Sequence, residues 1–346
     1  MKEWYFMTPL TTTTNKKLRY VFATFWLLAN IVLAWLLAER QVSFRNSGMW
    51  IALLFLLPCI VVLMRLIRNP ISDEPTERKT SKGKLGVLIA VIVIAVLFLQ
   101  LVLGKFILLT LPVFAVVILF LLKQPLDKRE WLYASFLALM ASVAGLGAEW
   151  IEFITPSQWS LLQVPLTLLS FLAGWSILRR SGLLQQGVGR SRFIAEGTLP
   201  AVRSFLLGIL LGTPWALASI AMGSAEGSKV AWVKSWWQPL IAFQPGIAEE
   251  AWGRLLLVPL AFLLFRRVSP NRTAFFTALI VMAYWFAYLH TSGNIVSVLV
   301  STLIVGTLFV LPISVVCFYC DLETAIGFHF WMDFLKLLFA LFLFNR

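Results

Sequence analysis

Histidine, cysteine and charge are scarce in this chain of 346 residues. It has two histidines and three cysteines, and charged residues make up 13% of it. The two histidines lie far apart, so there is no HExxH pair for a metal. Cys59 is expected to be an apolar packing residue. Cys317 and Cys320 form a CxxC at the end of an apolar segment, without a βαβ context or a second ligand pair, which argues against redox or zinc chemistry there.

What the chain has in abundance is apolar sequence. Hydrophobic residues make up 60% of it, and the mean hydropathy is +0.87. Several apolar runs reach the roughly 20 residues that cross a bilayer as a helix. We therefore predict an all-α, polytopic bundle of about 10–11 transmembrane helices. The expected spans are 18–38, 49–67, 85–104, 106–122, 131–148, 160–178, 202–222, 244–265, 273–290, 294–317 and 322–344.

The net charge of +13 follows the membrane topology. With the N-terminus in the cytoplasm, most Lys and Arg residues fall in inner loops and few in outer loops, as the positive-inside rule requires. The basic residues then indicate orientation and contact with membrane lipids, and nucleic-acid binding is not expected. Residues 20–38 are expected to be an uncleaved signal anchor. We predict an integral protein of a bacterial-type cytoplasmic membrane.

Polar residues within apolar segments divide the chain into two regions. Residues 1–197 are expected to form an N-terminal helical region with few buried polar groups and a flexible cytoplasmic linker near 69–84. Residues 198–346 contain both histidines and an acid pair within apolar segments, where ionisable groups are rare and usually functional. No internal repeat is visible, which disfavours a duplicated transporter.

The first motif is an acid pair followed by an arginine, Glu249, Glu250 and Arg254. Neighbouring residues of a helix point about 100° apart, so the two acids face different directions. Glu250 and Arg254 are spaced i, i+4 and can form an ion pair. Glu249 is then free to approach solvent or a histidine. The alternative is an interfacial acidic cluster at a helix start, which the helix dipole favours.

Each histidine also has a partner at helical spacing. Phe286 lies four residues before His290, and Asp333 lies four residues after His329. A carboxylate beside an imidazole fixes its tautomer and raises its basicity. The alternative for each histidine is a structural hydrogen bond between helices.

The order and spacing of the three motifs resemble the signature of the CPBP family, intramembrane proteases related to the CAAX prenyl endopeptidase and also called the Abi family. The resemblance covers roughly residues 200–344. The motifs are Glu249-Glu250-Ala-Trp-Gly-Arg254, Phe286-Ala-Tyr-Leu-His290 and His329-Phe-Trp-Met-Asp333.

The resemblance implies an endopeptidase whose glutamate and histidine activate water within the membrane. Glu249 and His290 would hold and deprotonate the water, while Glu250 and Arg254 position the helix. The substrate would be a hydrophobic peptide or a membrane protein. The family has been described both as metal-dependent and as glutamic; we favour the form without a cofactor.

The resemblance also implies roles for the third motif, and a set of zinc ligands if the enzyme is metal-dependent. His329 and Asp333 would face the oxyanion, and zinc would be held by Glu249, His290 and His329. In the family, Asn is the commoner residue at the end of the third motif, where this chain has Asp333. An ionised Asp333 has no hydrogen to donate. We expect Asp333 to orient His329, which leaves His329 as the oxyanion donor.

Two other functions fit the same residues. Buried Glu, His and Asp side chains can serve as the relay of a proton- or ion-coupled transporter. A catalytically silent relative that acts by binding is the other, because Asp333 departs from the family pattern.

The expected spans place the three motifs at different depths. If 294–317 crosses the bilayer as a straight helix, His329 starts on the opposite side from Glu249 and His290. We therefore predict a broken or hairpin path over 294–320, with Gly306 and Pro312 as break points. Tilted helices or a misplaced upstream span are the alternatives.

Overall fold

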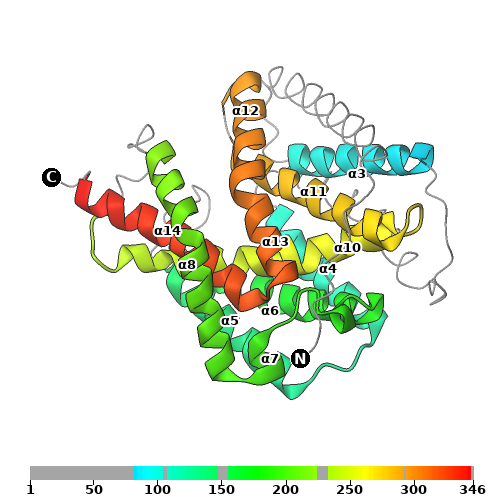
Figure 1. Ribbon diagram of the computed structural model, residues 1–346, viewed down its shortest axis with the longest axis horizontal. Coiled ribbons are helices and arrows are strands. Elements are labelled where there is room, and N and C mark those ends of the chain that lie inside the picture. Colours follow the sequence, from blue (N-terminus) through cyan, green and yellow to red (C-terminus); the bar gives the residue numbers. More distant parts are fainter. Residues whose placement is uncertain (1–81, 104–106, 147–154, 224–232, 292, 344–346) are drawn as a thin grey trace, which may run out of the picture.

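Helices make up nearly all of the chain that the computed structural model describes, namely residues 82–103, 107–146, 155–223, 233–291 and 293–343 (Figure 1). No strand occurs among these residues, so the predicted all-α fold class is confirmed. The predicted spans 18–38 and 49–67, and the linker near 69–84 up to residue 81, lie outside the described residues.

The first group of elements ends at the boundary predicted near residue 197. In chain order they are α3 (Lys82–Leu103), α4 (Ile107–Leu122), α5 (Lys128–Gly145), α6 (Pro156–Ser181), the 3₁₀ turn η2 (Leu184–Gln186) and α7 (Arg192–Glu196).

The second group carries all three motifs. It consists of α8 (Thr198–Gly223), η4 (Gln238–Ala242), α9 (Phe243–Glu249), η5 (Glu250–Leu256), α10 (Leu257–Phe265), α11 (Asn271–Leu289), α12 (Ile295–Val305), η6 (Gly306–Val310), α13 (Leu311–Tyr319) and α14 (Leu322–Leu343). Each predicted span from 85–104 onward coincides with one helix or with a continuous run of these elements.

Local sequence signals set several helix ends. At the start of α6 the Thr155 hydroxyl accepts the Gln158 backbone N–H at 3.3 Å, the usual role of an N-cap residue. The same helix ends at Gly182, whose φ of 79° is left-handed and suits glycine. At the start of α12 the Asn294 side chain accepts the Ser297 backbone N–H at 2.9 Å.

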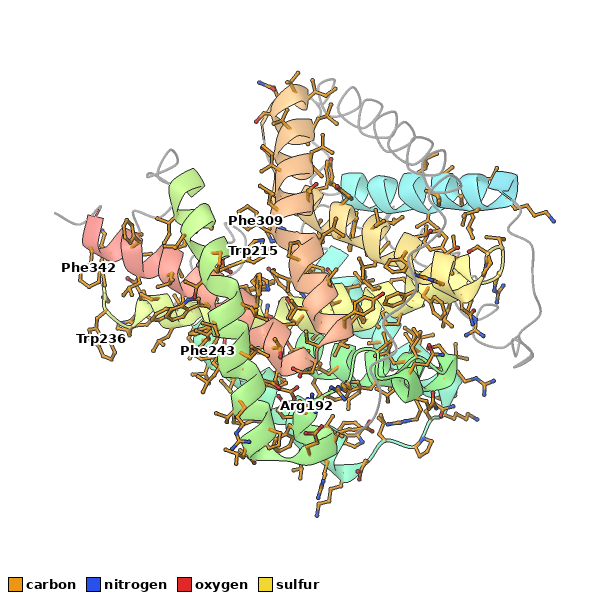
Figure 2. The ribbon with its side chains drawn as sticks, viewed as in Figure 1. Arg192, Trp215, Trp236, Phe243, Phe309 and Phe342 are labelled. Carbon is orange, nitrogen blue, oxygen red and sulfur yellow. The ribbon has the colours of Figure 1, made fainter. Side chains whose placement is uncertain are left out.

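The composition of the helices is that of a membrane protein. Among the described residues, five helices are long and apolar enough to cross a bilayer: Pro156–Ser181, Thr198–Leu217, Asn271–Leu289, Ile295–Tyr319 and Leu322–Phe342. Large apolar side chains also lie on the outer surface, such as Trp236 (79% exposed) and Phe342 (62% exposed) at one edge of the molecule (Figure 2). In water such a surface would be unfavourable, whereas lipid matches it. The total of about ten to eleven spans stays a prediction.

The predicted broken or hairpin path over 294–320 is wrong. Residues Ile295–Tyr319 form one continuous helical run of 25 residues. Gly306 does mark a change, because the π-helix η6 begins there, and Pro312 follows η6 as the second residue of α13 without ending the helical run. The chain continues without reversing, and α12–α13 runs across the directions of α11 and α14 in Figure 1. Inclined helices, the alternative named above, replace the hairpin.

The α8–α14 contact is so close that only glycine fits it. A Cβ on Gly208 would lie 2.1 Å from the Thr324 backbone oxygen, and a Cβ on Gly327 would lie 2.1 Å from the Phe205 oxygen. Gly212, one turn beyond Gly208, similarly faces Phe328. Small residues four apart are a common device for bringing membrane helices together. The contact holds α14, and with it the third motif, against α8.

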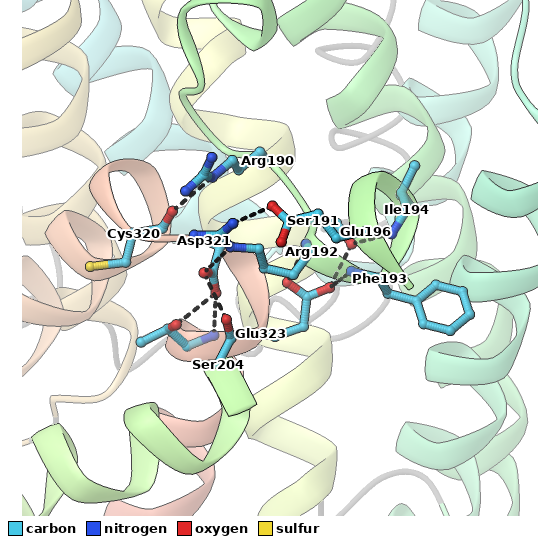
Figure 3. Close-up of polar contacts among 11 residues, drawn as sticks. Arg190, Ser191, Arg192, Phe193, Ile194, Glu196, Ser204, Cys320, Asp321 and Glu323 are labelled. Carbon is cyan, nitrogen blue, oxygen red and sulfur yellow. Dashed lines mark hydrogen bonds and ion pairs between the residues drawn. The ribbon is translucent and has the colours of Figure 1, made fainter. Parts of the chain in front are cut away.

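A buried acid pair fixes the start of α14 (Figure 3). The Asp321 carboxylate accepts the Thr324 N–H at 2.8 Å and pairs with Arg192 Nε at 3.2 Å. The Glu323 carboxylate accepts the backbone N–H groups of Arg192 and Phe193 at the start of α7, at 2.9 and 3.1 Å. The α13–α14 turn is therefore tied to the segment that precedes α8.

One apolar core includes side chains from both sides of residue 197. It contains Phe171 and Trp175 of α6 together with Ala251 of η5 and Phe318 of α13. The last helices before residue 197 therefore pack directly against the helices that carry the motifs. The division into regions 1–197 and 198–346 stays a prediction about function.

Substitution of Gly327 by alanine tests the α8–α14 contact. The added methyl must push the Phe205 backbone away, and such overpacking costs about 1–3 kcal/mol. We expect Gly327→Ala to lower the unfolding midpoint of the detergent-solubilised protein, followed by circular dichroism. The matched control is Gly86→Ala in α3, which has open space around its Cβ and should be neutral or stabilising. Equal midpoints for both variants would contradict the contact.

Candidate functional site

The first motif lies where an α-helix becomes a π-helix. Glu249 is the last residue of α9, and Glu250 begins η5. Gly253 allows this stretch to approach α11, since a Cβ there would lie 2.9 Å from the Phe286 ring. Single π-turns within α-helices occur frequently at functional sites. The local irregularity is therefore at the position where the sequence carries its acid pair.

Glu250 and Arg254 form the predicted ion pair, which is fully buried. Arg254 Nη1 lies 3.0 Å from Glu250 Oε1. The guanidinium also sits 4.4 Å from the centre of the Phe286 ring, where a cation is attracted by the aromatic face. Burial in an apolar core requires that such charges be paired. The pair therefore fixes the rotation of η5.

Glu250 has a second partner that the sequence reasoning missed. Its Oε1 accepts a hydrogen bond from Nδ1 of His329 at 2.8 Å, across a separation of 79 residues. A carboxylate accepts only, so Nδ1 carries the hydrogen and Nε2 faces away from Glu250. This bond joins η5 to α14 and sets the tautomer of His329.

Glu249 lies between the two histidines. Its Oε1 is 3.5 Å from Nε2 of His290, and its Oε2 is 3.6 Å from Nε2 of His329. Both separations exceed a direct hydrogen bond, and they leave the three groups within reach of one shared water or proton. The structure thus brings together Glu249, His290 and His329, as the sequence predicted.

His290 is held from behind by α11. It follows the last residue of that helix, and its Nδ1 lies 2.9 Å from the Phe286 backbone oxygen. Because a carbonyl accepts only, Nδ1 donates and Nε2 is directed to Glu249. The imidazole stacks on the Phe286 ring with centroids 4.7 Å apart, so the predicted partnership of these two residues is confirmed.

Asp333 shares a face of α14 with His329, as predicted, but its carboxylate forms no direct hydrogen bond with Nε2 of the imidazole. Its Oδ2 lies 3.5 Å from Nε2 of His329, on the same side as Glu249. The orienting role that we predicted for Asp333 is performed by Glu250 at Nδ1. Sequence spacing could show the i, i+4 neighbour but not the contact from another helix.

The exposed fractions of the side chains show which side of the site is open. His290 is 43% exposed and Asp333 is 29% exposed, whereas Glu249 is 15%, His329 8% and Glu250 0%. Exposure thus falls steadily from His290 and Asp333 to the buried ion pair. A reactant would meet Glu249 from the side of His290 and Asp333.

The residues named for a metal come close together without a preformed ligand cage. Among the described residues, no group of three or more His, Cys, Asp or Glu side chains is arranged as a metal site. Glu249, His290 and His329 nevertheless have the chemistry for one, because both Nδ1 atoms are hydrogen-bonded and both Nε2 atoms face the carboxylate. Cys317 and Cys320 are free thiols.

Comparison with known proteins identified no relative of this chain. No family model, no curated protein and no solved structure matches the chain. The resemblance to the CPBP family therefore stays a prediction, based on the three motifs.

Removal of Arg254 alone tests the buried ion pair. Arg254→Met removes the cation from the buried Glu250 carboxylate and leaves it only the hydrogen bond from His329; breaking a buried ion pair typically costs about 3–5 kcal/mol. The double variant Glu250→Gln/Arg254→Met removes both charges, so we expect a clearly higher unfolding midpoint than in the single variant. Arg203→Met, at an exposed position of α8, is the control and should be neutral. If single and double variants unfold at the same temperature, the pairing does not stabilise this core.

Proposed function

We propose that this chain is an intramembrane endopeptidase of the CPBP type, which hydrolyses a peptide bond of a hydrophobic peptide or a membrane protein. One observation carries the proposal: the Glu249 carboxylate lies within one water of two imidazoles whose other nitrogens are already engaged. Such an arrangement of carboxylate and imidazole is typical of sites that activate water. We place the protein in a bacterial-type cytoplasmic membrane with its N-terminus in the cytoplasm.

The first step is the positioning of water. A water between Glu249 and His290 finds two acceptors, a carboxylate oxygen and the Nε2 of a neutral imidazole whose Nδ1 donates to Phe286. It can donate one hydrogen to each and direct its oxygen at a substrate carbonyl. Glu249 takes the proton as the water attacks, and His290 keeps the water in place.

The second step is stabilisation of the oxyanion. His329 donates Nδ1–H to Glu250, and in its protonated form it also has Nε2–H to donate toward the oxyanion. The carboxylates of Glu250 and Asp333 lie near this ring and favour the positive charge. As the C–N bond breaks, the proton on Glu249 passes to the leaving nitrogen. One water is consumed, and an acid and an amine are released.

In a metal-dependent form of the site, the same residues would act as metal ligands. Glu249, His290 and His329 would hold the ion, and a bound zinc ion would acidify the attacking water. We favour the glutamic form because Glu249 with His290 is sufficient to bind and deprotonate a water. Chelator treatment and metal analysis of the pure protein separate the two forms.

Loss of Glu249 or His290 should abolish cleavage. With a library of hydrophobic peptides and purified protein, we expect Glu249→Ala and His290→Ala to lower the cleavage rate by about 10²- to 10⁴-fold. Cys317→Ala, a change at a buried thiol, is the control and should cleave normally. Full cleavage activity of Glu249→Ala would contradict the mechanism. Ion transport into liposomes without proteolysis would favour a transporter, and peptide binding without either would favour a silent relative.

Asp333→Asn separates the roles of the two neighbours of His329. Since Glu250 holds Nδ1 of the imidazole, we expect the amide variant to retain the wild-type cleavage rate within about tenfold, whereas loss of an orienting carboxylate typically costs 10- to 100-fold. Glu250→Gln is the comparison and should show the larger loss. A larger loss in Asp333→Asn than in Glu250→Gln would return the orienting role to Asp333.

A further inference from the structure

Most buried polar side-chain atoms without a hydrogen-bond partner in the described chain belong to α6 and η5, two helices that pack together at Gly174. Four residues of α6 carry such atoms: Gln163, Thr167, Ser170 and Trp175. In η5 they are Glu250 Oε2 and two nitrogens of Arg254, and the remaining one belongs to Trp285 in α11. Well-packed proteins pair more than nine-tenths of their buried polar groups, so a concentration of this kind needs a physical cause.

Three of the α6 residues form a row on one face of the helix. Gln163, Thr167 and Ser170 follow one another at spacings of four and three, and all three are 0% exposed. Gly174, four residues further, continues the row and lies directly against η5, since a Cβ there would be 2.4 Å from the Leu255 backbone oxygen. The row therefore faces the helix that carries the acid pair.

The two helices run side by side in the same direction. A Cβ on Gly145 would meet Gln163 of α6 at 4.0 Å and Gln244 of α9 at 3.4 Å, so these two side chains lie at one level. Eleven residues further along each helix, Gly174 meets Leu255. The polar row thus extends alongside α9 and η5 toward the Glu250–Arg254 pair.

Two small side chains lie on the helices that pack against α6. Ala248 is one α-helical turn after Gln244, and Ala251 is four residues before Leu255 in the π-helix η5; both alanines are 0% exposed. Neither can bond to the hydroxyl groups of the row. Lipid and apolar side chains offer no partner, so the unpaired groups cost free energy.

Local rearrangement accounts for part of the row only. A serine can donate to the carbonyl one turn back, as Ser176 does to Leu172 at 2.8 Å. Thr167 and Ser170 could be satisfied in that way by rotation. That route belongs to short hydroxyl side chains, and it does not extend to the amide of Gln163, the indole of Trp175, or Nε and Nη2 of Arg254.

We propose that ordered water occupies the interface between α6 and α9–η5, from the level of Gln163 to the Glu250–Arg254 pair. The groups without partners include donors and acceptors, and Ala248 and Ala251 of α9 and η5 have small side chains. A ligand that satisfies them must be small and must both donate and accept hydrogen bonds, as water does and an ion of one sign does not. The waters would bond the row to the rear of the site.

The water has a use if the proposed function holds. Each hydrolysis consumes one water, and the surrounding lipid supplies none. Water along α6 would replenish the site from its buried side, while the substrate occupies the open side at His290 and Asp333. This role rests on the proposed function, whereas the hydration itself does not.

Cysteine reactivity tests the hydration without any assay of activity. In the full chain with Cys59, Cys317 and Cys320 replaced by alanine, Thr167→Cys or Ser170→Cys places a thiol in the row. Silver ion is the probe, because it is small and reacts with thiols in contact with water. Unreacted thiol is counted by alkylation and mass spectrometry. Leu172→Cys is the matched control, since Leu172 is equally buried on the same helix and points elsewhere.

The proposal predicts that the thiols of the row react at least about tenfold faster than the control thiol, because thiol reactivity follows access to water. Equally slow reaction at all three positions would overturn it. A second pair of variants covers the case in which a cysteine disturbs folding. Thr167→Val and Ser170→Ala remove the hydroxyls at nearly constant shape, and each should lower the unfolding midpoint, because the waters lose a partner. A higher unfolding midpoint in both variants would also overturn the proposal, since it would mean that the hydroxyls are simply unsatisfied.

The two proposals fail in different ways. Fast thiol reaction in a protein that cleaves no peptide would leave the hydration standing and remove the endopeptidase. Slow thiol reaction in a protein whose cleavage depends on Glu249 would do the reverse.

Discussion

The arrangement of the site depends on one buried carboxylate. Glu250 accepts Nδ1–H of His329 at 2.8 Å and pairs with Arg254 at 3.0 Å, so a single side chain joins η5 to α14. A charge in an apolar interior must keep such partners, which fixes the rotation of both helices. Glu249, the preceding residue, is then directed about 100° around the helix from Glu250. There it lies 3.5 Å from Nε2 of His290 and 3.6 Å from Nε2 of His329.

The rest of the described fold holds these two helices in place. Asp321 and Glu323 fix the start of α14 against α7, and the glycines at its crossing with α8 bring the backbones into contact. Behind η5, α6 packs through Gly174 and presents a polar row to the same helix. The helices before residue 197 thus contribute packing and, on our proposal, water to a site whose reactive residues all come later in the chain.

Sequence periodicity was sufficient for what lies within one helix and insufficient for what lies between helices. The length of apolar runs gave the helices from 85–104 onward, and helical spacing gave the Glu250–Arg254 pair and the common face of His329 and Asp333. The bond between Glu250 and His329 joins distant residues, and no spacing indicates it. The hairpin over 294–320 was wrong because the depth argument assumed upright, parallel helices, whereas α12–α13 is inclined to its neighbours. The pair Gly208 and Gly212 and the row on α6 were visible as patterns and could have been used.

The central claim is that a water held by Glu249 and His290 attacks the peptide bond directly. The most direct measurement is a single turnover in water labelled with the heavy oxygen isotope, with hydroxylamine present as a competing nucleophile. The account predicts that the new carboxylate of the product carries the heavy oxygen and that no hydroxamate forms. A hydroxamate product would mean that the peptide is first transferred to a side chain of the protein, and it would contradict the account.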